Sequence, residues 1–309
     1  MLSASQRLRF LFPKESQPSV PLFIFLPGMD GTGQLYKTQS SGLIADFDIR
    51  CLSIPPDDLT DWEGLVEQLA NLIEAEQKQT AHRLTYICGE SFGGCLALKL
   101  VAHFPHLCDR LILVNPASSF SRKPWMQWGA SITQWLPDSL YRLSAKGLLP
   151  FLIAQERVAR QNRQALLAAM QSVTSETAAW RLSLLSQFAL EKLPLDRIEQ
   201  PVLVIASQND RLLPSEEEAE RLVRCLPKSQ KILLPKSGHA CLLETEVNLG
   251  EILGSQRFYD DIWFQSIGNR LERKYAYQAK PNKEVKSIFS GGFRSAFMTP
   301  RSRFSGAAK

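Results

Sequence analysis

The pentapeptide Gly89-Glu90-Ser91-Phe92-Gly93 constrains the fold of this chain more than any other feature of its sequence. In a G-x-S-x-G turn a strand bends into a helix so sharply that the central serine takes a strained backbone conformation. Side chains two positions away on either side would collide, and Gly89 and Gly93 remove them. Since Gly and Ser are each about 7% of residues, the bare pattern is expected by chance in roughly one chain in ten of this length. The pentapeptide is therefore only suggestive unless the flanking sequence also predicts a strand before it and a helix after it.

The surroundings alternate between strand-like and helical patterns. Helical spacing of apolar residues is clear over 62–76, and 95–104 is apolar on nearly every side until Pro105. Ser215 followed by Glu218 predicts a capping box, at the start of a helix that runs to Leu226. The predicted strands, each rich in aliphatic or β-branched residues, are 21–26, 49–54, 84–88, 111–115, 202–206 and 231–234. This alternation predicts an α/β fold, with a mostly parallel central sheet flanked by helices.

The long interval between the fourth and fifth predicted strands interrupts the alternation. It has no convincing strand, and its helical stretches are 125–135, 139–149, 154–173 and 178–190. We therefore predict a helical cap over 118–199, inserted into a core formed by 1–117 and 200–254. Trp125, Trp128 and Trp135 form an apolar helical face. That face either packs on the core or, as the alternative, lines an acyl-chain pocket or touches a membrane.

Charge and cysteine usage exclude several classes of protein. Residues 265–309 hold ten Lys or Arg against two Glu, a balance of +8, so the remaining chain carries +5 − 8 = −3. A mildly acidic body is not typical of nucleic-acid binding, although the basic tail suits anionic lipid or another protein. We expect 255–309 to be a basic, aromatic-containing tail that is largely disordered. The six cysteines form no C-x-x-C or His-containing cluster, so neither metal nor a disulfide framework is expected.

No targeting or membrane-spanning pattern is found along the sequence. The first 20 residues lack a charged start followed by an apolar run, and nowhere do 18 apolar residues stand together. We therefore expect a protein that is not secreted and has no transmembrane segment. The expected location is cytoplasmic, or peripheral on an intracellular membrane.

A serine hydroxyl needs a base to remove its proton and a third group to orient that base. Of the four histidines, His82 precedes the strand that leads to the pentapeptide. His103 and His106 lie a helix beyond it, roughly 18 Å away at 1.5 Å per residue. His239 remains, in a turn after the last predicted strand, where ligands of open α/β sheets bind. A lone histidine is more often structural, but position and elimination favour His239 as the base for Ser91.

The orienting acid must also follow a strand. Asp210 does so, four residues after the predicted strand 202–206. The structural alternative is that Asp210 only makes a turn before Pro214. The end of the strand 111–115 offers no carboxylate, and Glu216–Glu218 suit a helix N-terminus, where their charge meets the dipole. The resulting order of serine, acid and histidine is the order expected of α/β-hydrolases.

Acyl chemistry at a serine also needs N–H donors for the oxyanion that forms on attack. The backbone N–H of Phe92 is one candidate. The segment 26–33, after the first predicted strand, contains three glycines, including Gly28 and Gly31, and the N–H of Met29 is the second candidate. Neither G-x-G-x-x-G nor a following Gly-Lys-Ser is present, so this loop does not predict nucleotide binding, and we expect no cofactor.

Three segments resemble the phytyl ester synthase and diacylglycerol acyltransferase-like family, a branch of the α/β-hydrolases found in chloroplasts and cyanobacteria. They are FLPGMDGTG at 25–33, ICGESFGGCLAL at 87–98, and the run from VIASQNDRLLPSEEEAERL to LPKSGHACLLE across 204–244. The likeness covers roughly 20–250. It implies an α/β-hydrolase fold and a thylakoid-type membrane as one possible location. It also implies acyl transfer from an acyl-lipid, acyl-CoA or acyl-carrier-protein donor to phytol or diacylglycerol.

The sequence departs from the plant members in one respect. Those resemble a fusion with a second, glycerolipid-acyltransferase-like domain carrying His-x-x-x-x-Asp, and no histidine here has an Asp five positions later. Any transfer is therefore expected from Ser91, Asp210 and His239 alone. Two alternatives remain: a carboxylic ester hydrolase (lipase, esterase or thioesterase) using the same three residues, and a non-catalytic, membrane-associated binding protein.

Overall fold

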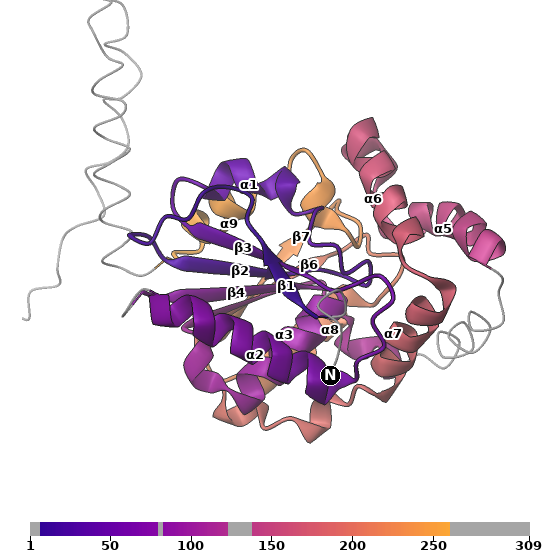
Figure 1. The fold of residues 1–309 in the computed structure, drawn as a ribbon. Coiled ribbons are helices and arrows are strands. Elements are labelled where there is room, and N and C mark those ends of the chain that lie inside the picture. Colours follow the sequence, from indigo (N-terminus) through magenta and orange to yellow (C-terminus); the bar gives the residue numbers. More distant parts are fainter. Residues whose placement is uncertain (1–6, 80–82, 123–137, 260–309) are drawn as a thin grey trace, which may run out of the picture. The chain divides into compact units, whose positions relative to one another are not determined.

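The computed structural model describes residues 7–79, 83–122 and 138–259, and within them seven strands form one sheet (Figure 1). Their order across the sheet is β1-β3-β2-β4-β5-β6-β7. The strands are β1 (Arg9–Leu11), β2 (Leu22–Leu26), β3 (Asp48–Ser53), β4 (Thr85–Glu90), β5 (Arg110–Val114), β6 (Val202–Ser207) and β7 (Ser229–Leu234). Only β1 runs antiparallel to its neighbour; the other five neighbouring pairs are parallel. The predicted mostly parallel sheet is confirmed.

All six predicted strands are present, and β1 is the one that the sequence did not predict. It has three residues at the sheet edge, too few to show an apolar alternation. The sheet order changes direction between β2 and β4, which lie side by side although β3 separates them in sequence. In open α/β sheets ligands bind at the carboxyl ends of strands beside such a crossover. Here β2, β4, β6 and β7 all end at that edge.

Helices cover both faces of the sheet (Figure 1). α1 (Lys37–Leu43) and α9 (Leu249–Ser255) contact each other on one face, and neither was predicted. The other face carries α2 (Trp62–Gln79), α3 (Phe92–His103) and α8 (Ser215–Cys225). The predicted apolar face of α2 is buried, as its three- and four-residue spacing requires.

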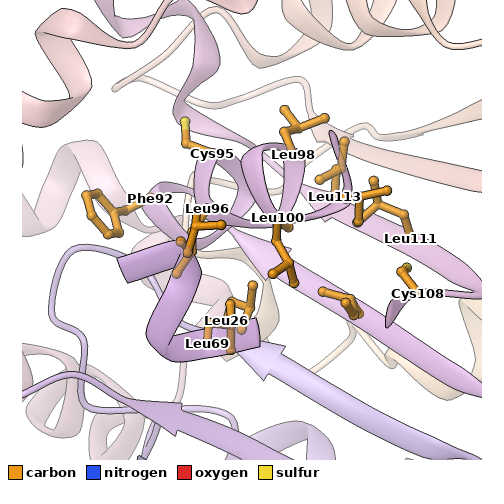
Figure 2. Close-up of a cluster of buried hydrophobic side chains, with 14 of the residues drawn as sticks. Leu26, Leu69, Phe92, Cys95, Leu96, Leu98, Leu100, Cys108, Leu111 and Leu113 are labelled. Carbon is orange, nitrogen blue, oxygen red and sulfur yellow. The ribbon is translucent and has the colours of Figure 1, made fainter. Parts of the chain in front are cut away.

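α3 is the central helix of the main core. Leu96 and Leu100 of α3 belong to the same hydrophobic cluster as Leu26, Leu111 and Leu113 of the strands (Figure 2), and all five are fully buried. An apolar surface on almost every side, as the sequence predicted for 95–104, suits a helix enclosed by protein. The core therefore fixes both ends of the strand-turn-helix unit that carries Ser91.

Buried cysteines contribute to this core as small apolar residues. Burial raises the pKa of the Cys51 thiol to about 12, and it raises the pKa values of Cys88, Cys95 and Cys108 as well. A thiol that stays protonated is a poor nucleophile. These side chains therefore pack and do not compete with Ser91 as a reactive group.

The interval between β5 and β6 is helical, as predicted. It contains η3 (Ala117–Arg122), α5 (Asp138–Leu152), α6 (Arg160–Ser172) and α7 (Ser175–Gln187). The predicted single helix over 154–173 is wrong: a 3-10 turn, η4 (Gln155–Arg157), precedes α6. The helix is interrupted here because Val158 forms a β-bridge with Glu244 and Arg157 donates to the Glu244 carboxylate at 2.7 Å. The predicted helix 125–135, with its three tryptophans, and the tail beyond 259 lie outside the described residues.

Candidate active site

Ser91 lies at the sharp turn between β4 and α3, with a φ of 53° in the left-handed region. A Cβ added to Gly89 would lie 2.3 Å from the carbonyl oxygen of Gly93. One added to Gly93 would lie 2.1 Å from the carbonyl oxygen of Leu26. Both distances are far below van der Waals contact, so both glycines are required for the turn. The backbone strain predicted for Ser91 is present in the structure.

Three side chains that are distant in sequence meet at this edge of the sheet. His239, on the loop after β7, has its Nε2 2.9 Å from Ser91 Oγ and its Nδ1 2.7 Å from Asp210 Oδ2. Both His239 and Asp210 are buried within the fold, while Ser91 is partly exposed. Of the other histidines, His82 is outside the described residues, and His103 lies at the opposite end of α3. The structure therefore brings together the three residues that elimination selected.

Four donors surround the Asp210 carboxylate. Its Oδ1 accepts from the amides of Leu212 and Leu213, at 2.8 and 2.9 Å, and its Oδ2 accepts from His239 and from the Ser215 hydroxyl. Burial works to raise the pKa of Asp210, but the charge and hydrogen bond of His239 together with the other donors outweigh it and lower the pKa. Asp210 is thus held ionised and in one orientation.

Ser215 has a different role from the one expected from the sequence. The predicted capping box is wrong, since Pro214 occupies the N-cap position of α8 and makes no side-chain cap. The Ser215 hydroxyl turns to Asp210 instead. A buried carboxylate gains more from a charge-assisted hydrogen bond than a helix end gains from a neutral cap.

The pKa of His239 is raised above its usual 6.5. Burial opposes the charged imidazolium and is the largest effect, but the Asp210 carboxylate, its hydrogen bond and the charge of Glu90 together outweigh it. An imidazole in this setting accepts a proton from a neighbouring hydroxyl more readily than an isolated one. The Ser91–His239–Asp210 chain thus has the geometry and the electrostatics that nucleophilic acyl chemistry needs.

Two residues that the sequence analysis did not assign hold the His239 loop in place. Asn115, with a φ of 41°, donates from Nδ2 to the carbonyl of His239 at 2.6 Å and accepts at Oδ1 from the Ser207 amide at 2.8 Å. Glu244 accepts from the amide of Gly238 at 2.8 Å. The signal in the sequence was an Asn at a strand end, a residue type that tolerates positive φ. In the sequence analysis, this strand end is used only to exclude a carboxylate.

The glycine-containing loop after β2 runs alongside Ser91. An ideal Cβ on Gly28 would lie 3.8 Å from Ser91 Cβ. The amide of Phe92 begins α3, and the first amides of a helix have no acceptor within it. Both features suit donors aimed at a carbonyl oxygen bound to Ser91. The roles of Met29 and Phe92 in an oxyanion hole remain predictions.

Arg181, which the sequence analysis did not single out, connects α7 to this loop. It is 2% exposed and donates to the carbonyl of Met29 at 2.6 Å and to that of Pro55 at 2.9 Å. Gly31, with a φ of 68°, has its ideal Cβ position only 2.7 Å from Arg181 Nη1, so a side chain there would displace the guanidinium. The helical insertion thus fixes the Met29 carbonyl directly.

Two further carboxyl groups lie beside the three central residues. Glu90, next to Ser91, has its Oε1 buried and without a hydrogen-bond partner within the described part of the chain. Burial raises the pKa of Glu90 to about 7; the charge of His239 works to lower this pKa, and the charge of Asp30 works to raise it. Asp30, in the loop after β2, also has a pKa raised by burial, although hydrogen bonds from Thr32 oppose this. The second position of the pentapeptide therefore carries a titratable group whose pKa depends on the charge of His239.

Across 7–79, 83–122 and 138–259, no group of three or more His, Cys, Asp and Glu side chains is arranged to hold a metal ion. Within these ranges no helix combines the length and the hydropathy needed to cross a bilayer.

The fold and the site together define the class of protein. A parallel sheet flanked by helices, with a strained serine after β4 and a histidine after the last strand, is the α/β-hydrolase arrangement. The model of the Hydrolase_4 family, described as serine aminopeptidase, S33, matches residues 57–246, more than half of the chain. The chain belongs to this family of α/β-hydrolases and is an enzyme with esterase and acyltransferase relatives.

The individual proteins that this chain resembles include a phytyl ester synthase and two esterases. Phytyl ester synthase 1, chloroplastic, of Arabidopsis thaliana is 32% identical over 266 residues, which are 79% of this chain and 38% of the plant protein. A pimeloyl-[acyl-carrier protein] methyl ester esterase of Nitrosomonas europaea is 30% identical over 51% of this chain and 65% of its own length. Among solved structures, an esterase (EaEST) from Exiguobacterium antarcticum has a TM-score of 0.67 and 17% identity, covering 81% of this chain and 94% of its own. The chain thus spans about two fifths of the plant relative.

Proposed function

We propose that this protein carries out serine-dependent acyl transfer on fatty-acyl lipids through an acyl-serine intermediate. The acyl acceptor that we propose is a long-chain alcohol such as phytol, or diacylglycerol. The observation that carries the proposal is the hydrogen-bonded chain from Ser91 through His239 to Asp210 at the strained turn. The 32% identity to a phytyl ester synthase supports the substrate class.

The first half-reaction forms the acyl-serine. His239 takes the proton from Ser91 as the serine oxygen attacks the acyl carbonyl, and Asp210 keeps the imidazole in the tautomer that accepts at Nε2. The N–H groups of Met29 and Phe92 stabilise the oxyanion of the tetrahedral intermediate. When that intermediate collapses, the bond to the leaving group breaks and His239 donates its proton to the departing alcohol or thiol.

The second half-reaction decides the type of enzyme. His239 removes a proton from the acceptor hydroxyl, whose oxygen attacks the acyl-serine, and the proton then returns to Ser91 Oγ. An alcohol acceptor gives a new ester, whereas water gives a free fatty acid. Transfer therefore requires that the acceptor exclude water from Ser91.

A carboxylic ester hydrolase is the second candidate, and the relatives give a specific reason to test it. The pimeloyl-[acyl-carrier protein] methyl ester esterase and the solved esterase are both named for ester cleavage. The same Ser91, His239 and Asp210 serve either reaction. The non-catalytic, membrane-associated binding protein has less support, because all three residues and their hydrogen bonds are present.

Donor, location and membrane contact complete the proposal. The donor is an acyl-lipid, acyl-CoA or acyl-carrier protein, and the location is cytoplasmic or peripheral on an intracellular, thylakoid-type membrane. Peripheral contact is proposed for the helical insertion and for the basic tail, which carries ten Lys or Arg after residue 264. No cofactor is part of the mechanism.

The test is to incubate the purified protein with a labelled acyl donor, with and without phytol or diacylglycerol, and to identify the products by chromatography and mass spectrometry. A labelled phytyl ester or triacylglycerol that depends on Ser91 supports acyl transfer. Release of labelled fatty acid alone, unaffected by either acceptor, would establish the hydrolase. No covalent labelling of Ser91 by donor or by a fluorophosphonate would reject both enzymes.

A further inference from the structure

Helix α5 exposes an apolar face that no described residue covers. Leu140, Leu143, Leu148 and Phe151 are 51%, 60%, 43% and 50% exposed. At about 100° per residue these four positions fall within an arc of about 140° on one side of the helix. Gly147 lies in the same arc, and a Cβ added there would meet no atom within 4 Å. Ser144, also exposed, is the one polar residue in this arc, so the outward side of α5 is open and mostly apolar.

The opposite side of α5 already makes the contacts that hold the helix. Leu149 and Leu152 pack against a cluster formed with Ile153, Val158 and Leu243. A surface helix with one buried apolar stripe normally carries polar residues on its other side. Packing among the described residues therefore does not account for the second apolar face, and contiguous apolar surface of this kind is typical of interaction sites.

The C-terminal end of α5 lies against the loop that carries His239. The Leu152 carbonyl accepts from the Ala240 amide at 2.8 Å. Gly238 is so close to the same segment that a Cβ on it would lie 2.7 Å from the Ala154 nitrogen. The exposed face thus ends beside the candidate active site rather than at a remote surface.

Charge distinguishes between possible occupants of this face. Residues 138–163 carry five Lys or Arg against two Asp or Glu, a formal balance of +3, while residues 1–264 together carry −3. One of the five, Arg157, is paired with Glu244 and Glu246. Lys146 of α5 and Arg160 at the start of α6 are both exposed. A second copy of the chain would bring two positive surfaces together, whereas an anionic lipid surface offers the complementary charge. Apolar side chains flanked by Lys and Arg are typical of helices that lie in a membrane interface.

We propose that α5 is the element through which this protein lies on an anionic lipid bilayer, with Leu140, Leu143, Leu148 and Phe151 entering the boundary between headgroups and acyl chains. The inference rests on the proposed function for its purpose, which is to bring acyl lipids to the edge of the sheet where Ser91 lies. Binding itself needs no turnover, so it is measured separately.

The test is sedimentation of the full chain with vesicles of phosphatidylcholine alone or mixed with phosphatidylglycerol. The wild-type chain binds the mixed vesicles, and binding weakens as salt is added. The double variant Leu143→Glu/Phe151→Glu lowers the partition coefficient at least about tenfold, because two apolar groups that would enter the bilayer become charged. Leu59→Glu is the matched control: it places the same charge at an apolar position that is 44% exposed, between β3 and α2. It leaves vesicle binding unchanged.

Further measurements distinguish membrane binding by α5 from the proposed catalytic function and from dimerisation. Ser91→Ala binds vesicles like the wild type, so a failed acyl-transfer assay does not affect the result. Circular dichroism verifies that each variant is folded. Undiminished binding by Leu143→Glu/Phe151→Glu, or an equal loss in Leu59→Glu, overturns the proposal. A wild-type dimer in solution that the double variant converts to monomer, without a change in vesicle binding, assigns the face to a second copy instead.

Discussion

At the scale of single residues, the site depends on strain and burial imposed on ordinary side chains. Ser91 keeps a left-handed backbone because Gly89 and Gly93 leave no side chain to collide with the neighbouring carbonyls. Asp210 stays ionised in a buried position because it accepts from two amides, a hydroxyl and an imidazole. Each group has a function only because its neighbours fix its orientation or its charge.

Ser91→Ala removes the proposed nucleophile. We expect turnover to fall on the order of 10⁶-fold, a magnitude known from subtilisin. Fold stability should be little affected, because Ser91 is partly exposed and, among the described residues, its hydroxyl bonds only to His239. Steady-state kinetics with an acyl ester measure the effect. Retention of more than a few per cent of the activity would contradict the assignment of Ser91.

Glu90→Gln tests the carboxyl group beside the nucleophile. The charge of Glu90 helps to raise the pKa of His239, so its removal makes the imidazolium less stable and lowers that pKa. A general base acts in its neutral form. The acidic limb of the pH–activity profile should therefore move to lower pH. Glu67→Gln removes the same charge from an exposed position on α2, and it should leave the limb in place. A limb that stays unmoved in Glu90→Gln would count against the coupling.

At the scale of elements, the inserted helices act on the site through specific contacts. α7 supplies Arg181, which binds the carbonyls of Met29 and Pro55, and the segment before α6 supplies Arg157, which binds Glu244 under the His239 loop. The insertion is thus connected to both loops that surround Ser91. A rearrangement of the insertion would therefore change the position of the Met29 carbonyl and of the His239 imidazole.

Arg181→Met tests the connection between α7 and the loop after β2. Loss of the guanidinium frees the Met29 carbonyl, so the residue whose N–H is the proposed oxyanion donor is no longer held at its carbonyl end. Because one such donor is worth roughly 10²–10³ in kcat, we expect kcat to fall at least about tenfold, with a smaller change in KM. Arg181→Lys should recover part of this rate, since an ammonium still donates to one carbonyl.

The matched control for Arg181 is Arg50→Met. Arg50 is also buried, but it pairs with Asp48 and Glu76 close to Arg83, which precedes β4 and so marks the opposite edge of the sheet. Both variants should unfold at lower urea concentration, because each leaves buried polar groups unpaired. If Arg50→Met lowered kcat as much as Arg181→Met, the effect would be one of stability and the positioning role would be lost.

At the scale of the whole molecule, a buried ion cluster and the main core hold the two edges of the sheet. Asp48 receives Arg50 at 2.6 Å and Arg83 at 2.7 Å, joining β3 to the start of β4. Burial works to raise the pKa of Asp48, but the two guanidinium groups outweigh it and lower the pKa to about 2. This stabilisation lies far from Ser91 and should affect folding without affecting the chemistry.

Asp48→Asn tests that cluster through the pH dependence of unfolding. A folded-state pKa of about 2, against 3.8 for the unbound group, gives stability that is fully present above pH 3.8 and is lost as the pH falls through 2. The difference corresponds to about 2 kcal/mol. In urea titrations between about pH 5 and pH 2, the wild type should lose about 2 kcal/mol more than Asp48→Asn. Parallel losses would show that Asp48 is not the group responsible.

The sequence determined the arrangement of the chain because its signals are local. Alternating aliphatic runs and three- and four-residue spacing located six strands and the main helices, and glycines at 89 and 93 located the turn. The order of Ser91, Asp210 and His239 along the chain followed from which residues come directly after strands. These inferences need no knowledge of what lies opposite each side chain.

Only the tertiary structure decided which polar groups meet. Ser215 looked like a helix cap, yet it donates to Asp210. Arg181 carried no distinctive pattern and Asn115 only its place at a strand end, yet they hold the loops beside Ser91 and His239. Short elements such as β1 form through contacts with residues far away in sequence, so local pattern did not predict them. The exposed face of α5 is likewise visible only once the other side of that helix has been packed. Local periodicity fixes the elements, whereas the pairing of buried charges and donors depends on partners up to 210 residues away.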